Sequence, residues 1–328
     1  VDAHLHVRNF TFNQAYLGEM NLHGGWEKEK NAIFLHARMS DPAHSSMTSV
    51  DGDIRIGAAP KGGLDLMIRT ENIDLSFLNH YTDGIFTGLH GRASGWTRVF
   101  KGINLEGDML VSEGGMKVNA TEVDYRLVND SVILRPDNIY FRNAMVYDRQ
   151  GTPGKDEHYA VVNGVLQHSN LSHMRFDFDI DAYNILGYDV KDFGDEVFCG
   201  TAYATGKIGF NGQPGNLNIN IDARPEENTM FVYNLSSPTT LTDNQFITYK
   251  THQDSIDGHS HSPSGTPLPE PESDMRINFR LNLTPEATMK ILMDPKAGDY
   301  IALNGHGNIR ANYYNKGDFT MYGTYIID

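Results

Sequence analysis

The sequence predicts an all-β protein built as an elongated stack of antiparallel hairpins, and three observations lead to this prediction. Hydrophobic and polar residues alternate along many short segments, with the two-residue period of a strand that has one hydrophobic face. Turns rich in Gly, Asn, Asp and Pro separate these segments and supply the backbone angles that hairpins require. Long helical patterns are scarce, and no fixed repeat indicates a propeller or a leucine-rich fold.

The alternating segments are spread along the whole chain. The clearest are LDLMI at 64–68, NIDLSFL at 72–78, RFDFDIDA at 175–182, NLNINIDA at 216–223 and RINFRLNL at 276–283. Turn sequences such as GQPG at 212–215 stand between such segments. Because successive strand side chains point to opposite faces, each segment predicts a strand with one apolar face.

Three segments carry some helical character. DLSFLNHY at 74–81 and DAYNILGY at 181–188 are the best candidates for short helices. TPEATMKILMD at 284–294 begins like a helix, because Thr-Pro-Glu resembles a helix start. Its apolar residues nevertheless alternate, and the neighbouring segments are strands. We therefore expect a strand over 284–294.

Charge and cysteine content exclude several classes of function. The chain of 328 residues has a formal net charge of −15, which disfavours binding to nucleic acid and simple adhesion to anionic lipid. A single cysteine, Cys199, excludes an internal disulfide framework, and we expect a buried structural thiol. No apolar run approaches the roughly 20 residues of a membrane helix. The chain begins with Val, and we expect it to be a segment whose targeting signals lie elsewhere.

The sequence contains no motif for nucleophilic catalysis or phosphate binding. It lacks GxSxG, HExxH and a GxxxxGK followed by Ser or Thr. GHGN at 305–308 contains a GxG, but it lies within strand-like sequence and opens no helix. No acid–base pair stands out among the 42 carboxylates. We expect no catalytic residues and no cofactor.

Two groups of residues are considered as metal ligands. Asp177, Asp179 and Asp181 form a carboxylate row, but neighbours on one strand face lie roughly 6.6 Å apart, too far for one calcium ion without other ligands. The histidines of interest are His252, His259 and His261, together with the alternating pair His4 and His6. A stable site needs ligands that are held in place by further contacts. We expect a solvated strand face for the aspartates and no metal site for the histidines.

The apolar strand faces are the most informative feature. An open sheet with a continuous apolar face must cover it with another sheet, a helix layer or a ligand. Too few amphipathic helices are predicted here to cover many strands. The sheet therefore either folds on itself as a sandwich with an ordinary core, or curls around a long groove.

A series of motifs in the last third of the chain bears on this choice. They are FCGTAYATG at 198–206, LNINIDA at 217–223, TPEA at 284–287, DPKAGD at 294–299, GHG at 305–307 and GDFTMYGTY at 317–325. In content and order they resemble the conserved C-terminal domain of the TamB family, an AsmA-like, bridge-like group in diderm bacteria. The upstream sequence from about residue 50 is also similar to TamB of the Bacteroidota type. The segment 252–274, rich in Pro and Ser, departs from the family's compact pattern, and we expect a flexible insertion there.

The resemblance implies a β-taco, which is a long curled antiparallel sheet with an apolar groove. It implies upstream β-taco repeats over 1–196, a TamB C-terminal domain over 197–251 and 275–328, and the insertion over 252–274. It further implies a periplasmic component of the translocation and assembly module, whose N-terminal inner-membrane helix is absent from this segment. The implied partners are phospholipid or another acyl-chain lipid and an Omp85-type outer-membrane barrel (TamA- or BamA-like).

With this resemblance, the alternating residues predict a lipid-binding groove that solvates acyl chains and performs no catalysis. The residues predicted to face inward are Ile73, Leu75, Phe77, Phe176, Phe178, Ile180, Leu217, Ile219, Ile221, Ile277, Phe279, Leu281, Leu283, Met289, Ile291 and Met293.

Two other functions remain open. In the first, strand edges pair with nascent outer-membrane proteins by β-augmentation, as a chaperone would. In the second, the chain is a secreted glycan-binding or glycan-degrading β-protein, which requires exposed aromatic platforms and a carboxylate pair at the separation found in glycosidases. The presence of only two tryptophans, Trp26 and Trp96, disfavours the glycan hypothesis.

Overall fold

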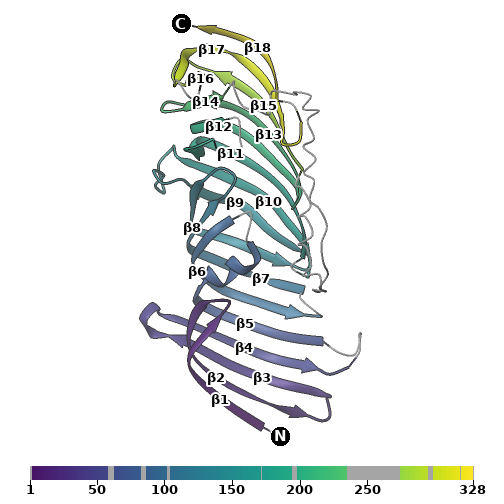
Figure 1. Cartoon of the computed structure of the whole chain (residues 1–328). Helices are drawn as coiled ribbons and strands as arrows, with labels where there is room; N and C mark the ends of the chain where they lie inside the picture. Colours follow the sequence, from purple (N-terminus) through teal and green to yellow (C-terminus); the bar gives the residue numbers. More distant parts are fainter. Residues whose placement is uncertain are drawn as a thin grey trace, which may run out of the picture.

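The predicted all-β fold is confirmed. The computed structural model describes residues 2–57, 63–82, 86–101, 104–170, 172–193, 198–234, 274–294, 298–317 and 319–327. These residues form eighteen strands, two 3-10 helices and one α-helix of four residues. Figure 1 shows the strands stacked in one long curled sheet, with the N-terminus at one end and the C-terminus at the other.

The strands follow one another with short connections over most of the chain. Their bounds are β1 Asp2–Phe12, β2 Ala15–Glu27, β3 Ala32–Asp41, β4 Ser46–Arg55, β5 Gly63–Asp74, β6 Phe86–Phe100, β7 Asn104–Val118, β8 Val123–Arg135, β9 Asn138–Tyr147, β10 Tyr159–Ser169, β11 Ser172–Val190, β12 Phe198–Gln213, β13 Asn216–Pro225, β14 Met230–Asn234, β15 Asp274–Leu283, β16 Thr288–Asp294, β17 Asp299–Tyr314 and β18 Thr320–Ile327. The 3-10 helices are η1 Pro42–His44 and η2 Leu75–Leu78, and α1 is Asn79–Thr82.

From β1 to β12 each strand pairs antiparallel with the next strand along the chain. β13 and β14 then pair with successive parts of β12, so they act as one interrupted strand. β15 and β16 repeat this arrangement beside them, and β17 pairs with both before β18 completes the sheet.

The structure departs from a purely antiparallel sheet at one junction. β15 runs parallel to β13, and β16 runs parallel to β14. Parallel neighbours need a crossover connection, because the second strand must start at the same end as the first. Residues 235–273 connect β14 to β15. The predicted insertion at 252–274 falls almost entirely within them, outside the described residues.

At three of the bulges in the long strands, an Asn lies in the left-handed region of backbone conformation. Asn72 has φ 52°, Asn143 has φ 51° and Asn184 has φ 45°. A bulge leaves a backbone N–H without its ladder partner, and here a side chain on the neighbouring strand accepts it. The bonds run from Asn72 N to Ser94 Oγ at 2.9 Å, from Asn143 N to Asn163 Oδ1 at 2.8 Å, and from Asn184 N to Thr205 Oγ1 at 2.9 Å.

The segments with helical character have different outcomes. The helical prediction for 74–81 is confirmed, since Asp74 caps η2 by accepting a hydrogen bond from Ser76 N at 2.8 Å. The helical prediction for 181–188 is wrong, because this segment is the bulged part of β11 and pairs with β12. The predicted strand within 284–294 is confirmed as β16. Tertiary pairing therefore outweighs local helix preference at 181–188.

The buried core is divided into small clusters. One joins Leu17, Met20 and Met39, and Phe77 packs against it. Another joins Val123, Leu186 and Tyr203 where β8, β11 and β12 approach each other. Leu186, Val123 and Asp148 are the largest side chains below 2% exposure among the described residues. A closed sandwich of this size would seal many more large apolar side chains.

Candidate functional site

The strand register places apolar side chains of several neighbouring strands in rows on one face of the sheet. One row joins Phe178, Phe210, Ile219, Ile277 and Tyr313, each opposite the next on neighbouring strands. Directly opposed side chains on one face of a sheet lie in contact range. We call the face that carries these rows the apolar face.

Most of the predicted inward-facing residues occupy this apolar face. In the rows through β11, β13 and β15 these are Phe176, Phe178, Ile180, Leu217, Ile219, Ile221, Ile277, Phe279, Leu281 and Leu283. Met289 and Ile291 of β16 pair with Leu303 and Ile301 of β17, whereas Met293 lies at the register shift between Leu292 and Asp294. The sequence alternation therefore predicts which residues of β11, β13, β15 and β16 share a face.

The predicted inward-facing residues Ile73, Leu75 and Phe77 do not form such a row along one strand. Ile73 lies opposite Ala93 and ends the strand part of the segment. Leu75 and Phe77 lie in η2 and not in a strand, because Asp74 begins a 3-10 turn there. Phe77 still contacts the apolar face, where it packs beside Met20, and its ring centroid lies 5.9 Å from that of Phe12.

The apolar face also extends through the N-terminal strands β1 to β4, for which no inward-facing residues are predicted from the sequence. A row joins Leu5, Leu22, Ala37, Val50 and Ile68 across β1 to β5. Hydrophobic alternation within each strand is the sequence pattern that could predict these residues. The pattern is weak because glycine replaces a hydrophobic residue at some positions of the apolar face, as Gly52 does between Leu35 and Leu66.

Some positions of the apolar face are glycine because there is no room for a side chain. A Cβ on Gly206 would overlap the carbonyl oxygen of Asp222 on the neighbouring strand, and the residue has φ +157°. Gly209 lies on the opposite face of the same strand, and the nearest atom to a Cβ there is 3.9 Å away. The curled sheet brings neighbouring backbones close together at glycine positions of the apolar face.

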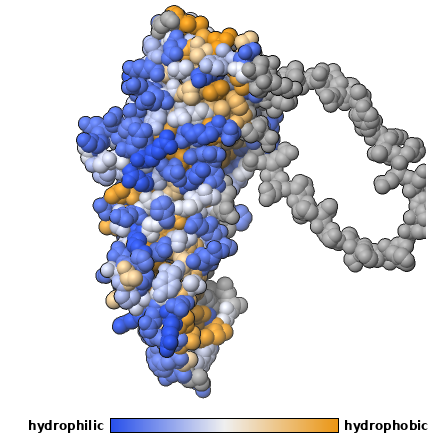
Figure 2. Space-filling view, turned by 60° about the vertical axis from the view of Figure 1, so that its left-hand side comes forward, coloured by the Kyte–Doolittle hydropathy of each residue, from blue (hydrophilic) through white to orange (hydrophobic). Residues whose placement is uncertain are grey.

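The exposure of the apolar face is intermediate. Phe176 is buried at 4% exposure, Met293 is 49% exposed, and the other predicted inward-facing residues are half-buried. Figure 2 shows hydrophilic residues over much of one side, with hydrophobic residues near both ends and in an interrupted strip between them. The face is therefore neither sealed as a core nor fully open to water.

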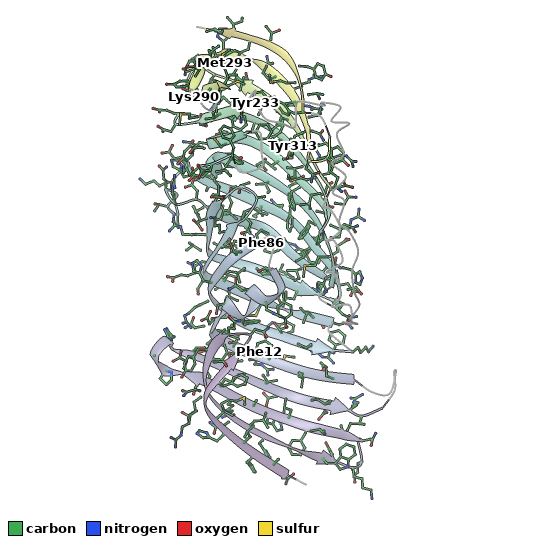
Figure 3. The ribbon with its side chains drawn as sticks, in the orientation of Figure 1. Phe12, Phe86, Tyr233, Lys290, Met293 and Tyr313 are labelled. Carbon is green, nitrogen blue, oxygen red and sulfur yellow. The ribbon has the colours of Figure 1, made fainter. Side chains whose placement is uncertain are left out.

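The two rims of the sheet meet near its C-terminal end. Phe198 pairs with Tyr233 at one rim. Tyr313, near the end of β17, lies at the opposite rim, as the labels of Tyr233 and Tyr313 in Figure 3 show, and Phe319 directly precedes β18. The Phe198 ring centroid lies 5.5 Å from that of Tyr313 and 5.4 Å from that of Phe319. We call these four residues the aromatic rim contact. It shows that the sheet curls far enough for its rims to touch.

The opposite face of the sheet is polar. Asp177 and Asp179 are exposed, and Asp181 forms an ion pair with Lys207 at 3.1 Å. Among the described residues, no group of three or more His, Cys, Asp or Glu could hold a metal ion. His6 contacts Asn21 and Glu19, and His4 stacks on His23. His252, His259 and His261 lie outside the described residues.

Buried polar groups lie near one rim beside β11 and β12. Cys199 is buried as predicted, and burial raises the pKa of its thiol. Burial disfavours ionisation of Asp189, but contacts with Lys191, Thr201 and Arg149 outweigh this and lower the pKa of its carboxyl group. A lowered pKa means that this carboxylate stabilises the fold above the ordinary carboxyl range and stops doing so as pH falls through the lowered value.

Together these features define a class: an elongated, curled, almost all-β protein whose sheet has one mainly apolar face and one mainly polar face. Residues 148–328, more than half of the chain, match the family model described as TamB C-terminal domain. The chain therefore belongs to the TamB family. No curated protein and no solved structure matches it.

Family membership supports a role in outer-membrane assembly or lipid transport, in the bacterial envelope. None of the helices in the described part of the chain has the length and hydrophobicity needed to cross a bilayer. The family match begins at residue 148, where β9 ends and the connection to β10 starts.

Proposed function

We propose that this chain is a non-catalytic, bridge-like component of the periplasm that carries phospholipid between the inner and outer membranes along its apolar face. The acyl chains would lie on the hydrophobic rows, and an Omp85-type barrel in the outer membrane would be the protein partner. One observation carries the proposal. Apolar residues stay in register from β1 to β18 while most of them remain only half-buried.

The energetics require such a continuous face. Exposing a 16-carbon acyl chain to water costs on the order of 12 kcal/mol, at about 0.8 kcal/mol per methylene. A lipid crosses the periplasm readily only if each step of its path removes a similar apolar area from water. Strands stacked about 4.8 Å apart give about 70 Å of apolar face along this sheet.

The aromatic rim contact fits the same proposal. Rings from both rims cover the apolar face beside β12 and β17, and they are apolar themselves. An acyl chain beneath them would be shielded from water on all sides. A polar headgroup must stay at the rim, because burying a phosphate without partners is unfavourable.

Photocrosslinking tests the proposal directly. A photoreactive amino acid in place of Ile219 is expected to capture lipid in cells, whereas one in place of Asn220 should capture little, because the two side chains point to opposite faces. Capture is measured by mass spectrometry of the crosslinked protein. Equal capture at the two positions, or none at Ile219, would contradict the proposal.

A second candidate function rests on the C-terminal edge of the sheet. β18 pairs only with β17 among the described strands, so its other edge is free to pair with an added strand. Large apolar side chains on it are exposed, including Met321 at 50% and Tyr322 at 64%. A chaperone-like role in outer-membrane protein assembly would use this edge. Thr324→Pro would then impair assembly of such proteins more than a polar substitution of the apolar face does.

A further inference from the structure

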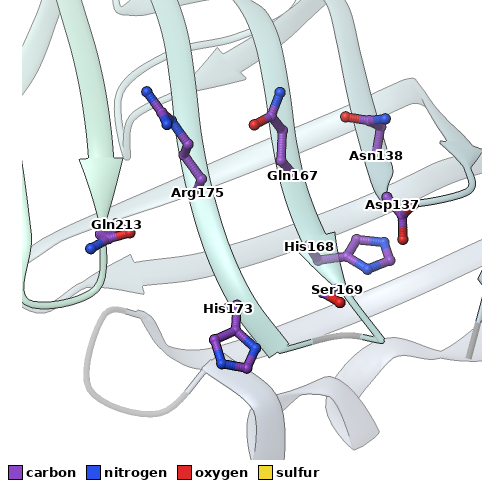
Figure 4. A pocket seen from close by; sticks show the side chains of 8 residues that line it. All are labelled: Asp137, Asn138, Gln167, His168, Ser169, His173, Arg175 and Gln213. Atoms are coloured by element: carbon purple, nitrogen blue, oxygen red, sulfur yellow. The ribbon is translucent and has the colours of Figure 1, made fainter.

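A polar pocket of about 430 Å³, largely open to solvent, lies at one rim of the sheet (Figure 4). It is formed where β8 turns into β9, where β10 turns into β11, and where β12 ends. Asp137, Asn138, Gln167, His168, Ser169, His173, Arg175 and Gln213 line it. Neither the family match nor the apolar rows account for this pocket.

The pocket adjoins the apolar face at the same rim. Asn138, Gln167 and Arg175 form a cross-strand row on the polar face. The neighbouring positions Ile139, Leu166 and Phe176 form a parallel row on the apolar face. The two rows lie on opposite faces of the same strands, so a lipid with its headgroup in the pocket would have to pass its acyl chains over the rim to reach the apolar face.

Two opposite charges line the pocket without pairing. Arg175 and Asp137 take part in none of the ion pairs between described residues, with each other or with another group (Figure 4). The side chain of His168 is buried at 4% exposure, and burial lowers its pKa, although the nearby carboxylate of Asp137 acts in the opposite direction. The amides of Gln167 and Asn138 lie between the two charges, and the amide of Gln213 lies on the other side of Arg175 (Figure 4).

We infer that this pocket binds a zwitterionic phosphodiester headgroup of the phosphoethanolamine class. The guanidinium of Arg175 suits the phosphodiester, since it can donate two parallel hydrogen bonds to phosphate oxygens. The carboxylate of Asp137 suits a primary ammonium group and disfavours a purely anionic headgroup. This inference rests on the proposed lipid-carrying function and specifies which lipid the rim selects.

The test uses the full chain and soluble probes as well as lipid. Glycerophosphoethanolamine, glycerophosphoglycerol and inorganic phosphate are titrated against the protein, and binding is followed by nuclear magnetic resonance. Vesicles containing phosphatidylethanolamine or phosphatidylglycerol then compete for loading of the protein, which is read by native mass spectrometry. The variants are Arg175→Gln and Asp137→Asn, and the control is Arg38→Gln, an exposed arginine on the same polar face.

We expect the unmodified chain to prefer the ethanolamine probes about tenfold, as one added charged hydrogen bond allows. Arg175→Gln should weaken binding of both phosphodiester probes about tenfold, and Asp137→Asn should abolish the preference between them. The control should change neither. If inorganic phosphate binds as tightly as glycerophosphoethanolamine does, the pocket is a site for free phosphate and the inference is overturned.

The outcomes separate this inference from the proposed function. Lipid capture at Ile219 with no effect of Arg175→Gln overturns the headgroup pocket and leaves the lipid path intact. Binding of glycerophosphoethanolamine with no lipid capture at Ile219 supports the pocket and contradicts the lipid path. If Arg38→Gln weakens binding as much as Arg175→Gln does, binding follows general charge, and the pocket is overturned.

Discussion

Phe279→Asp is expected to reduce lipid capture on the apolar face at least tenfold while the sheet remains folded. Phe279 lies between Ile221 on β13 and Ala311 on β17 in the middle of an apolar row. A carboxylate there must either give up its hydration when an acyl chain binds over it, or remain hydrated and interrupt the apolar face. Desolvating one charge costs several kcal/mol, and 1.4 kcal/mol already corresponds to a tenfold effect. Capture by a photocrosslinker at Ile219 gives the measurement.

Asn278→Asp is the matched control for this substitution. Asn278 precedes Phe279 on the same strand, is exposed, and belongs to the polar face with Asn218 and Asn220. The control adds the same charge to β15 without touching the apolar face. Circular dichroism should show β-structure for both variants. Undiminished lipid capture by the folded Phe279→Asp protein would show that this row does not hold lipid.

Asp148→Ala is expected to cause the largest loss of stability among single substitutions outside the apolar face. Asp148 is fully buried, and its carboxylate accepts hydrogen bonds from Gln150 N at 2.8 Å, Gly151 N at 3.0 Å and Leu186 N at 2.8 Å. Each buried amide left without an acceptor costs about 1–3 kcal/mol. We expect a loss of about 3–5 kcal/mol in the free energy of unfolding, measured by urea denaturation.

The more conservative substitution Asp148→Asn tests the same hydrogen bonds and is expected to cost less stability. An amide keeps one acceptor oxygen, which can serve Gln150 N and Gly151 N, but its NH₂ group would face Leu186 N as a second donor. The loss should therefore lie between that of Asp148→Ala and zero. Asp177→Asn, at an exposed position of the polar face, should change stability by less than about 0.5 kcal/mol. Equal stability of all three variants would refute the structural role of Asp148.

Much of the fold could be predicted from the sequence, because a half-buried strand repeats its pattern every two residues. The strands around Phe176, Leu217 and Ile277 alternate strictly, and the structure contains all of them. The helical prediction for 181–188 is wrong because a bulge at Asn184 shifts the alternation and imitates a helical period. A local pattern carries no information about the strand that will pair with it.

The candidate site can be predicted from the sequence where local alternation determines which face a residue occupies. It cannot be predicted where the site depends on contacts between residues far apart in the sequence. Met289 and Ile291 follow from alternation alone. The polar pocket joins Asp137 to Gln213, and the aromatic rim contact joins Phe198 to Phe319. These contacts depend on how far the sheet curls, which the sequence pattern does not specify.

The central claim is that the apolar face is a surface for hydrocarbon and not the core of a closed protein. The most direct measurement is lipid extraction and mass spectrometry of the whole chain after purification from a bacterial envelope in a mild detergent. We expect bound phospholipid in the unmodified chain and a much smaller amount in Phe279→Asp. If the folded, unmodified chain carries no lipid under conditions where a known lipid carrier keeps its cargo, the apolar face is not a surface for hydrocarbon.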